Sequence, residues 1–339
     1  ACLAFVRSDL ASPWGLPRGH SVLTMDEIPV HCKAKASIMK ILVSGSTGLV
    51  GGQLVHRLQK DDHTVIPLVR QRSKEGVLWN PVTGEVDVQG MEGHDAVVHL
   101  AGENIAEGRW TPAKKRRIRE SRIEGTRLLC RALAGLQKPP QTLISASAVG
   151  FYGNRGDERC DESSASGSGF LAETSIAWEE TTHAAADAGI RVTLPRLGIV
   201  LSKKGGALAK MLLPFKLGLG ARLGSGSQYM SWISERDLTE LLVYLILDSS
   251  LEGPVNAVAP QPVTNREFTK TLAKVVSRPA CFAAPELVLK TILGEMAEEM
   301  LLSGAHVISS KLVDTNFKFQ DPDLESALRF LLNPAACVT

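Results

Sequence analysis

The sequence predicts an α/β fold, with a doubly wound parallel sheet and a smaller, mostly helical C-terminal lobe. Two observations lead to this class. From residue 40, short runs of β-branched and other apolar residues alternate with amphipathic helical stretches, and strands separated by helices of this length pair in parallel. Beyond residue 200 the alternation gives way to helical stretches joined by Gly- and Pro-rich connections. That pattern is typical of a second lobe built from insertions and a C-terminal extension.

The expected elements follow one another along the chain. Residues 41–43 form a buried apolar strand, and residues 49–58 repeat apolar side chains at helical spacing. A second strand is expected at 65–69. Further strands are expected at 96–100, 142–145 and 190–194, and helices around 113–136, 172–188, 205–215, 235–248, 265–276 and 285–302.

Composition excludes several classes of protein. The 339 residues carry 38 basic and 36 acidic side chains, a net charge of +2. This nearly balanced charge does not indicate binding to nucleic acid or to an anionic membrane. No run approaches the roughly 18 apolar residues of a membrane-spanning helix. The six cysteines lie far apart, without CxxC or Cys/His spacing, so we expect a reducing compartment and no metal site.

Residues 1–38 differ from the rest of the chain. They carry Pro13, Pro17 and Pro29, scattered charges and no sustained period, so we exclude them from the fold and expect a disordered leader or targeting remnant. Their basic and hydroxyl residues suit an organellar transit peptide, whereas their three acidic residues do not. A plastid location, a cytoplasmic location and untranslated sequence at this end all stay open.

A glycine-rich loop follows the first strand directly. Gly45 permits a tight turn, Gly48 lets the backbone approach a pyrophosphate, and Gly51 lets the helix pack closely on the strand, while the helix N-terminus offers free N–H groups to the anion. An ordinary strand-turn-helix is the alternative, but the strand before the loop and the helix after it favour a Rossmann-type dinucleotide site. The residues expected to contact the cofactor here are Gly45, Ser46, Thr47, Gly48, Leu49, Val50 and Gly51.

The end of the second strand indicates which dinucleotide is bound. An NAD site places Asp or Glu there to accept from the ribose 2′-hydroxyl, whereas an NADP site needs a cation for the 2′-phosphate. The sequence reads Val69-Arg70-Gln71-Arg72-Ser73-Lys74 and offers no acid before Glu75. We therefore expect NADP(H), with Arg70 at the 2′-phosphate; a solvated basic loop is the alternative.

Three further segments resemble the extended short-chain dehydrogenase/reductase superfamily. They are His99-Leu100-Ala101-Gly102, similar to its fourth-strand signature, Arg122-Ile123-Glu124-Gly125-Thr126, similar to its NVxGT segment, and Ser145 to Gly153, similar to its SSxxVYG strand end. Residues 100–105, 212–220, 224–226 and 232–238 narrow the resemblance to its NADP-binding epimerase-family subgroup. Members of this subgroup in bacteria, animals and plastids include sugar-nucleotide epimerase-like and cell-division-inhibitor-like proteins. The resemblance covers about residues 39–332.

The resemblance implies a division of the chain into parts. Residues 39–200 form the NAD(P)-binding Rossmann domain, to which strands and helices return from 230–260, while residues 201–255 are substrate-lobe insertions and residues 256–335 a family-specific C-terminal domain. It also implies a homodimer through the helices around 113–136 and 172–188. The further cofactor contacts that it implies are Leu100, Ala101, Gly102 and Arg122. For the arginine, a surface position on its helix is the alternative.

The Tyr-Lys pair that the superfamily uses for proton transfer is missing. Its Lys follows its Tyr by four residues, one helical turn, and lowers the pKa of the phenol. In this chain the residues four positions after the three tyrosines are Gly156, Ile233 and Asp248. In the helix where the resemblance places the pair, Phe170 or Leu171 stands in place of Tyr and a hydroxyl residue in place of Lys.

Three residues are candidates for the chemistry. The resemblance gives Ser147 the hydroxyl that hydrogen-bonds the substrate oxygen, with a satisfied strand-end hydroxyl as the alternative. Glu173 lies in the helix that normally presents the pair, and an apolar cleft beside Phe170 would raise its pKa and make it a general acid; a surface or capping glutamate is the alternative. Tyr152 either lines the cleft or makes a structural hydrogen bond.

Two interpretations of function stay open. The first is an NADP(H)-dependent epimerase or oxidoreductase that acts on a nucleotide sugar or another polar carbonyl substrate through an unconventional proton donor. The second is a catalytically inactive NADP(H)-binding regulatory or scaffold protein, linked to cell or plastid division. Both predict cofactor binding, and they differ over turnover. The expected partner is a small molecule, with no nucleic acid and no membrane span.

Overall fold

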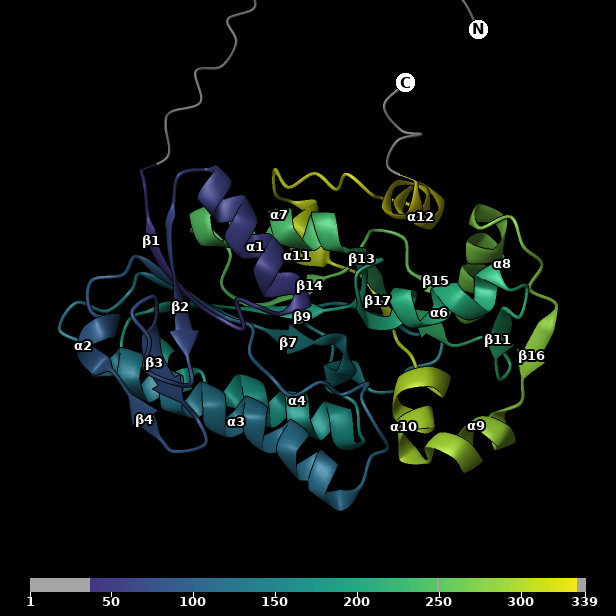
Figure 1. Ribbon diagram of the computed structural model, residues 1–339, viewed down its shortest axis with the longest axis horizontal. Coiled ribbons are helices and arrows are strands. Elements are labelled where there is room, and N and C mark those ends of the chain that lie inside the picture. Colours follow the sequence, from purple (N-terminus) through teal and green to yellow (C-terminus); the bar gives the residue numbers. More distant parts are fainter. Residues whose placement is uncertain (1–36, 249, 334–339) are drawn as a thin grey trace, which may run out of the picture. The chain divides into compact units, whose positions relative to one another are not determined.

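The computed structural model describes residues 37–248 and 250–333. The expected leader, residues 1–38, lies almost wholly outside the described residues. Figure 1 shows a central sheet with helices on both faces, followed along the chain by a lobe of smaller elements. The predicted α/β class with a doubly wound sheet is confirmed.

The central sheet has the strand order β14-β9-β6-β5-β1-β2-β3-β4. Its neighbours pair in parallel except β3 and β4, which are antiparallel. β1 pairs with β2 on one side and β5 on the other, so the strand order reverses there, and ligands of such sheets bind at the carboxyl edge beside this point. The strands are β1 (Lys40–Ser44), β2 (Thr64–Val69), β3 (Val77–Asn80), β4 (Glu85–Val86), β5 (Ala96–His99), β6 (Thr142–Ser145), β9 (Arg191–Leu197) and β14 (Gly253–Ala257), with β7 (Ser147–Ala148) also paired to β9.

Apolar side chains of β1 alternate between the two faces of the sheet. Ile41 and Val43 pack with side chains of α1 (Leu49–Lys60) and α7 (Glu235–Leu247) on one face, and Leu42 packs with side chains of α3 (Pro112–Ala134) on the other. All three β1 side chains are fully buried. Because helices cover both faces, a continuous apolar run rather than an alternating one marks this strand in the sequence.

The helix expected at residues 172–188 is two helices in the structure. They are α4 (Phe170–Glu180) and α5 (His183–Asp187). Between them, the hydroxyls of Thr181 and Thr182 each donate to the backbone carbonyl three residues earlier, at 2.6 and 2.7 Å. Such side-chain bonds compete with the helical ladder, and the chain turns at this point.

The second lobe has its own apolar core. Leu208 and Phe215 of α6 (Gly206–Lys216) pack with Trp232 and with Phe268 of α8 (Asn265–Val275). These two helices lie where the sequence predicts them. The stretch expected as one helix at 285–302 is instead α9 (Glu286–Leu293), α10 (Glu295–Ala297) and the π-helix η2 (Glu298–Leu302). Gly294, with φ +62°, separates the first two, because a left-handed residue cannot continue a right-handed helix.

The remaining elements are short, and sequence reasoning did not identify their strands. Each of these strands has only two or three residues and forms through a long-range partner, so no period reveals it. The strand pairs are β8 (Arg159–Cys160) with β17 (His306–Val307), β10 (Ile199–Leu201) with β13 (Trp232–Ser234), β11 (Ala221–Leu223) with β16 (Phe282–Ala284), and β12 (Tyr229–Met230) with β15 (Val263–Thr264). The other helices are α2 (Val88–Met91), η1 (Val149–Tyr152), α11 (Ser310–Val313) and α12 (Leu324–Leu332).

None of the helices in residues 37–248 and 250–333 combines the length and the hydropathy that crossing a bilayer requires.

Candidate functional site

The glycines of the loop between β1 and α1 are required by the backbone around them. Gly45 has φ +69°, and a Cβ there would lie 3.0 Å from the Ala101 nitrogen. At Gly51 a Cβ would lie 2.1 Å from the Gly45 carbonyl oxygen, closer than any two such atoms can approach. The loop therefore packs directly on the turn after β5 and on the start of its own helix, as expected of a Rossmann-type loop.

The first turn of α1 presents backbone donors without partners. Its N-cap residue, Gly48, has no side chain that could accept from them, and the first helical bond runs from Gly52 N to Gly48 O at 2.9 Å. Within the described chain, the N–H groups of Leu49, Val50 and Gly51 donate to no other residue. Such a helix start binds anions, because free N–H groups and the positive end of the helix dipole coincide there.

A buried hydrogen-bonded chain fixes the turn on which the loop packs. Ser44 Oγ accepts from the N–H groups of Leu100 at 3.0 Å and Ala101 at 3.2 Å, so its own hydrogen is donated to His99 Nδ1 at 2.7 Å. His99 Nε2 then carries the ring proton and donates to Thr126 Oγ1 at 3.1 Å. Burial lowers the pKa of His99 to about 4, so the ring is neutral at pH 7.

Arg70 is exposed at the carboxyl end of β2. Its backbone carbonyl accepts from Asn80 Nδ2 at 3.1 Å, which ties the loop to β3. Its guanidinium forms no ion pair within the part of the chain that the structure describes. Because β1 and β2 are parallel neighbours, this arginine lies at the same edge of the sheet as the glycine loop.

Arg122 is a half-buried cation on α3 that pairs with no carboxylate of the described residues. Its Nη1 donates to the carbonyl oxygens of Glu103 at 3.1 Å and Ile118 at 3.2 Å, and a Cβ at Gly102 would lie 3.4 Å from its Cζ. Removal from water lowers its pKa to about 10, so the group stays charged at pH 7. Nε and Nη2 donate to no acceptor in the described chain. These two atoms form the edge of the guanidinium that binds a carboxylate or phosphate side-on.

Ser147 lies against a carboxylate at the start of β7. Its hydroxyl donates to Glu179 Oε1 at 2.5 Å. Arg196 holds the same carboxylate by two bonds of 2.8 Å, Nε to Oε1 and Nη2 to Oε2, and the side chains of Arg196 and Glu179 are 4% and 12% exposed. Since the Ser147 hydrogen is used in this way, the hydroxyl has only lone pairs left to offer another molecule.

Tyr152 is fully buried, and its hydroxyl is bonded inside the protein. It accepts from Arg196 Nη1 at 2.9 Å, and it lies 2.9 Å from the Asp161 carbonyl oxygen and 2.8 Å from Asn256 Oδ1. Burial raises the pKa of Tyr152 to about 12. The geometry favours the structural hydrogen bond over the catalytic role, because a substrate has no exposed surface of the ring to approach.

Glu173 does not lie in an apolar cleft. It is exposed on the first turn of α4, where an acidic side chain interacts favourably with the helix dipole. The burial on which its expected role as a general acid depended is therefore absent, and this corrects the expectation from the sequence. Phe170 in the same turn is packed instead, with its ring 5.2 Å from the Trp110 ring and 4.5 Å from Lys115 Nζ.

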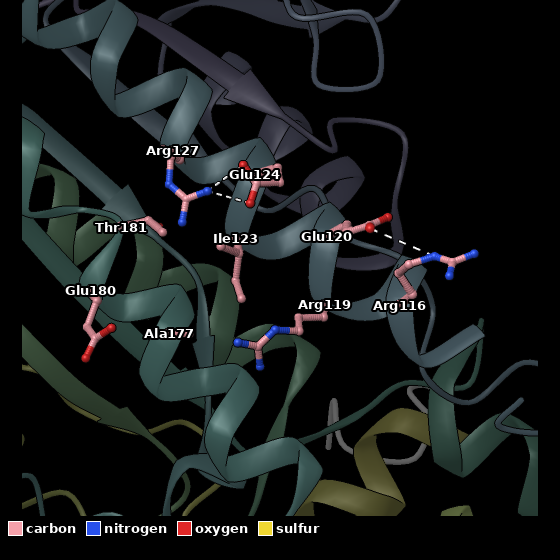
Figure 2. Close-up of a pocket in the computed structure, with 9 residues that line it drawn as sticks. All are labelled: Arg116, Arg119, Glu120, Ile123, Glu124, Arg127, Ala177, Glu180 and Thr181. Atoms are coloured by element: carbon pink, nitrogen blue, oxygen red, sulfur yellow. Dashed lines mark hydrogen bonds and ion pairs between the residues drawn. The ribbon is translucent and has the colours of Figure 1, made fainter. Parts of the chain in front are cut away.

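A groove with a volume of about 530 Å³ runs between α3 and α4 (Figure 2). Its charged side chains come from both helices and carry both signs. Two ion pairs lie within α3, whereas Arg119 of α3 and Glu180 of α4 form no ion pair with another described residue. In Figure 2 the Arg119 side chain extends toward α4. The lining residues are Arg116, Arg119, Glu120, Ile123, Glu124, Arg127, Ala177, Glu180 and Thr181.

Sequence reasoning did not identify Glu179, Asn256 or Glu299 as parts of this region. Their hydrogen bonds to Ser147, Tyr152 and the start of α4 span 32, 104 and 129 residues, and no local period links positions so far apart. One available signal was an asparagine within the apolar run of β14. In residues 37–248 and 250–333, no three His, Cys, Asp or Glu side chains are grouped so that they could hold a metal ion.

Comparison with known families gives two matches. A model described as the NAD dependent epimerase/dehydratase family matches residues 41–257. A second model, described as a domain of unknown function, DUF1731, matches residues 284–331. The first match spans the sheet from β1 to β14, and the second spans α9 to α12.

Individual relatives match over most of the chain. Epimerase family protein Mb2239 of Mycobacterium bovis is 44% identical over 292 residues, 86% of this chain and 96% of its own length. The chloroplastic SDR39U1 homologue of Arabidopsis thaliana is 36% identical over 334 residues, 95% of each chain. The crystal structure of human epimerase family protein SDR39U1 (isoform 2) with NADPH has a TM-score of 0.80 at 32% identity, covering 86% of this chain and 99% of that one.

Proposed function

The chain belongs to the NAD dependent epimerase/dehydratase family, and from this premise we propose that it binds NADP(H) at the carboxyl edge of the sheet, where β1 and β5 end. The supporting observation is the first turn of α1, whose unpartnered N–H groups adjoin a loop that only glycine can form. A similar human protein has been crystallised with NADPH. In this proposal residues 39–200, with elements returning from 230–260, hold the cofactor. Residues 201–255 are the substrate-lobe insertions, and residues 256–335 form a family-specific C-terminal domain.

The described residues fit each charged part of the cofactor. The N–H groups at the start of α1 suit the pyrophosphate, and the loop residues Ser46 and Thr47 adjoin it. The Arg122 guanidinium lies close to Gly102, in the turn after β5 on which the glycine loop packs, and its free Nε–Nη2 edge supplies a second positive group. Arg70 takes the 2′-phosphate. When bound, NADPH supplies a hydride.

For the substrate, we propose a nucleotide sugar or another polar carbonyl compound that interconverts with its alcohol. Ser147 contacts the reacting oxygen. Because its hydrogen is donated to Glu179, Ser147 accepts a hydrogen bond from a substrate hydroxyl rather than donating one to a carbonyl oxygen. The contact therefore favours the alcohol form of the substrate.

A second candidate function is an NADP(H)-binding regulatory protein without turnover, linked to cell or plastid division. The observation that favours it is the first turn of α4, where Phe170 is packed between Trp110 and Lys115 and Glu173 faces solvent. Phe170 has no group that could carry a proton, and Glu173 does not lie in the apolar cleft on which its role as a general acid depended. Under this proposal the bound cofactor changes the conformation of the protein, and a partner binds that conformation.

Calorimetric titration with NADPH and with NADH tests the cofactor assignment. We expect NADPH to bind at least about tenfold more tightly, since a 2′-phosphate gains a charge-assisted pair with arginine. Failure to bind either nucleotide would remove both proposals. A panel of nucleotide sugars and of small ketones, followed through NADPH absorbance, then separates them, since turnover of any member excludes the purely regulatory function.

We also propose that two copies pair through α3 and α4. The groove between these helices offers three arginines and three glutamates, and in this proposal the Arg119 of one copy pairs with the Glu180 of the other across a two-fold axis. Light scattering of Arg119→Glu, Glu180→Arg and the double charge swap tests this. The single variants are expected to dissociate and the double variant to recover, while a monomeric unmodified protein would exclude the proposal.

For location, we propose the plastid. The alignment with the chloroplastic relative covers 95% of this chain. It therefore includes part of residues 1–36. Import assays with isolated chloroplasts, using the chain with and without residues 1–38, test the proposal. Import of the chain only when residues 1–38 are present is the expected result, and equal import of both would contradict it.

A further inference from the structure

The first turn of α4 is capped by a carboxylate from the C-terminal part of the chain. The N–H groups of Phe170 and Leu171 donate to Glu299 Oε1 at 3.1 Å and Oε2 at 3.2 Å. The N-cap residue Gly169 contributes no side chain to this turn. Glu299 lies in η2, 129 residues beyond Phe170, so a helix of the nucleotide-binding part is completed by the last third of the chain.

The backbone at Gly169 leaves room for this contact. Its φ is +103°, a conformation that other residues rarely adopt. A Cβ there would lie 2.4 Å from Glu299 Oε1. A side chain at this position would therefore displace the carboxylate from the helix, and only glycine permits both the backbone conformation and the contact.

A second contact joins the same two regions. Lys115 Nζ of α3 lies 2.7 and 2.9 Å from the two carboxylate oxygens of Glu295, in α10, and 4.5 Å from the centre of the Phe170 ring. Figure 1 shows α10 beside the ends of α3 and α4. We call Lys115, Gly169, Phe170, Leu171, Glu295 and Glu299 the polar latch.

Apart from the latch, few contacts hold α9, α10 and η2 in place, and one of them is the hydrogen bond that Gln228 Nε2 donates to the Leu301 carbonyl oxygen in η2 at 2.7 Å. No residue of α9 or η2 is buried, and α10 buries only Ala297. Leu287 is 76% exposed and Ile292 58% exposed. Gly294, left-handed between α9 and α10, provides a point at which the backbone can turn. Segments with few buried apolar contacts and partly exposed ion pairs open at low free-energy cost.

The latch lies beside the loops that follow β5 and β7. Phe170 contacts Trp110, whose indole Nε1 donates to the Ile105 carbonyl in the loop after β5 at 2.8 Å. The Cβ of Leu171 lies 3.3 Å from where a Cβ of Gly150 would be, in η1 just after β7. The start of α4, where Glu299 is bound, therefore lies against loops at the carboxyl edge of the sheet.

We propose that residues 286–302 are a lid over this edge and that the polar latch must open for NADP(H) to enter or leave. The inference rests on the proposed cofactor site. Closing contacts are few and polar, so they form and break without unpacking a core. Cofactor exchange is thus limited by release of Glu299 from the first turn of α4.

The test compares Glu299→Gln with Glu298→Gln in the full chain. Both substitutions remove one negative charge from η2, but the Glu298 carboxylate pairs with Lys290, inside the lid itself. Hydrogen exchange of peptides covering residues 169–175 and 286–302 is measured without nucleotide, and the dissociation rate of NADPH is measured by displacement with excess NADP⁺. Gly169→Ala, which keeps the charge but blocks the contact, is the second opening variant.

Glu299→Gln and Gly169→Ala are expected to speed exchange in both peptides and NADPH dissociation by about fivefold or more, the effect of losing a charged helix cap. Glu298→Gln is expected to match the unmodified protein. Unchanged exchange in residues 286–302, or unchanged dissociation, in both opening variants would overturn the lid. If the unmodified protein binds no NADPH, the cofactor proposal itself fails, and the exchange data show separately whether the latch forms.

Discussion

The Ser44 hydroxyl lies 2.7 Å from Nδ1 of His99, joining the carboxyl ends of the neighbouring strands β1 and β5. The same oxygen accepts from the N–H groups of Leu100 and Ala101. One buried oxygen therefore sets both the tautomer of the histidine and the turn on which the glycine loop packs. The cofactor edge of the sheet depends on polar atoms inside the core as well as on the loop itself.

Replacing Ser44 with Ala is expected to weaken the binding of NADPH as well as the fold. The N–H group of Ala101 and one ring nitrogen of His99 lose their partner, at a cost of about 1–3 kcal/mol for each unsatisfied group, whereas Leu100 N keeps its bond to the Ser44 carbonyl oxygen at 3.3 Å. Urea denaturation and NADPH titration measure the two effects. Ser250→Ala, at an exposed hydroxyl, is the control, and equal stability of the two variants would contradict this role for Ser44.

Acidification is expected to destabilise the fold through His99. Its pKa is about 4 in the folded protein and about 6.5 in an unfolded chain. Between these values the unfolded chain binds the extra proton, so the free energy of unfolding falls as pH is lowered from 6.5 to 4, approaching about 1.4 kcal/mol per pH unit and about 3 kcal/mol in total.

Stability measured across this pH range tests the assignment to His99. His99→Gln is expected to be less stable at pH 7, but its free energy of unfolding should no longer fall in this way between pH 6.5 and 4. His56→Gln, at an exposed histidine, is expected to keep it. An unchanged slope in His99→Gln would assign the pH dependence to other groups.

Replacing either of two neighbouring glycines of α1 with alanine is expected to have opposite effects on the protein. At Gly51 the new Cβ would lie 2.1 Å from the Gly45 carbonyl oxygen, whereas at Gly52 it would lie 3.6 Å from the Ser46 oxygen. Gly51→Ala should therefore lower NADPH affinity at least about tenfold, because the loop must move. Gly52→Ala should raise stability by about 0.5–1 kcal/mol. Normal NADPH binding by Gly51→Ala would contradict the assignment of the loop.

Charge reversal at Arg70 is expected to change nucleotide preference rather than binding in general. Arg70→Glu should weaken NADPH binding by about 10–100-fold, because a like charge then faces the 2′-phosphate. NADH, which lacks that phosphate, should be affected little. Lys74→Glu is the control in the same loop, and a larger loss in that variant or in Arg72→Glu would move the phosphate contact along the loop.

Glu179 and Glu173 lie on the same helix, and their substitutions are expected to differ. Glu179→Ala leaves the Arg196 guanidinium buried without its carboxylate, which costs about 3–5 kcal/mol. Glu173→Ala, at an exposed position, should change stability by less than about 0.5 kcal/mol. Thermal and urea denaturation measure both. A large loss in the second variant would show that its carboxylate has a structural partner after all.

Five strands of the central sheet (β1, β2, β5, β6 and β9) and the glycine loop could be predicted because local sequence decides them. The continuous apolar run of β1 indicates burial on both faces, and the spacing of Gly45, Gly48 and Gly51 indicates a tight turn in which a Cβ at Gly51 would meet the Gly45 carbonyl oxygen. The absence of a Tyr-Lys pair is likewise a property of the sequence alone. The broken helix at 285–302 was missed, because one left-handed glycine among helix-forming residues gives a weak local signal.

The roles of individual polar residues were decided only by the tertiary structure. Glu173 and Glu179 are the same residue type and lie on the same helix, α4, yet Glu173 faces solvent and Glu179 is held by Arg196 from β9. Three roles depend on partners that folding brings from 32 to 129 residues away. They are the hydrogen-bond donation by Ser147, the buried hydrogen bonds of Tyr152 and the capping of α4 by Glu299. Sequence fixes which side chains exist and which segments are buried. Whether a polar group meets water or a partner depends on how those segments pack, since desolvation and hydrogen bonding act between neighbours in space.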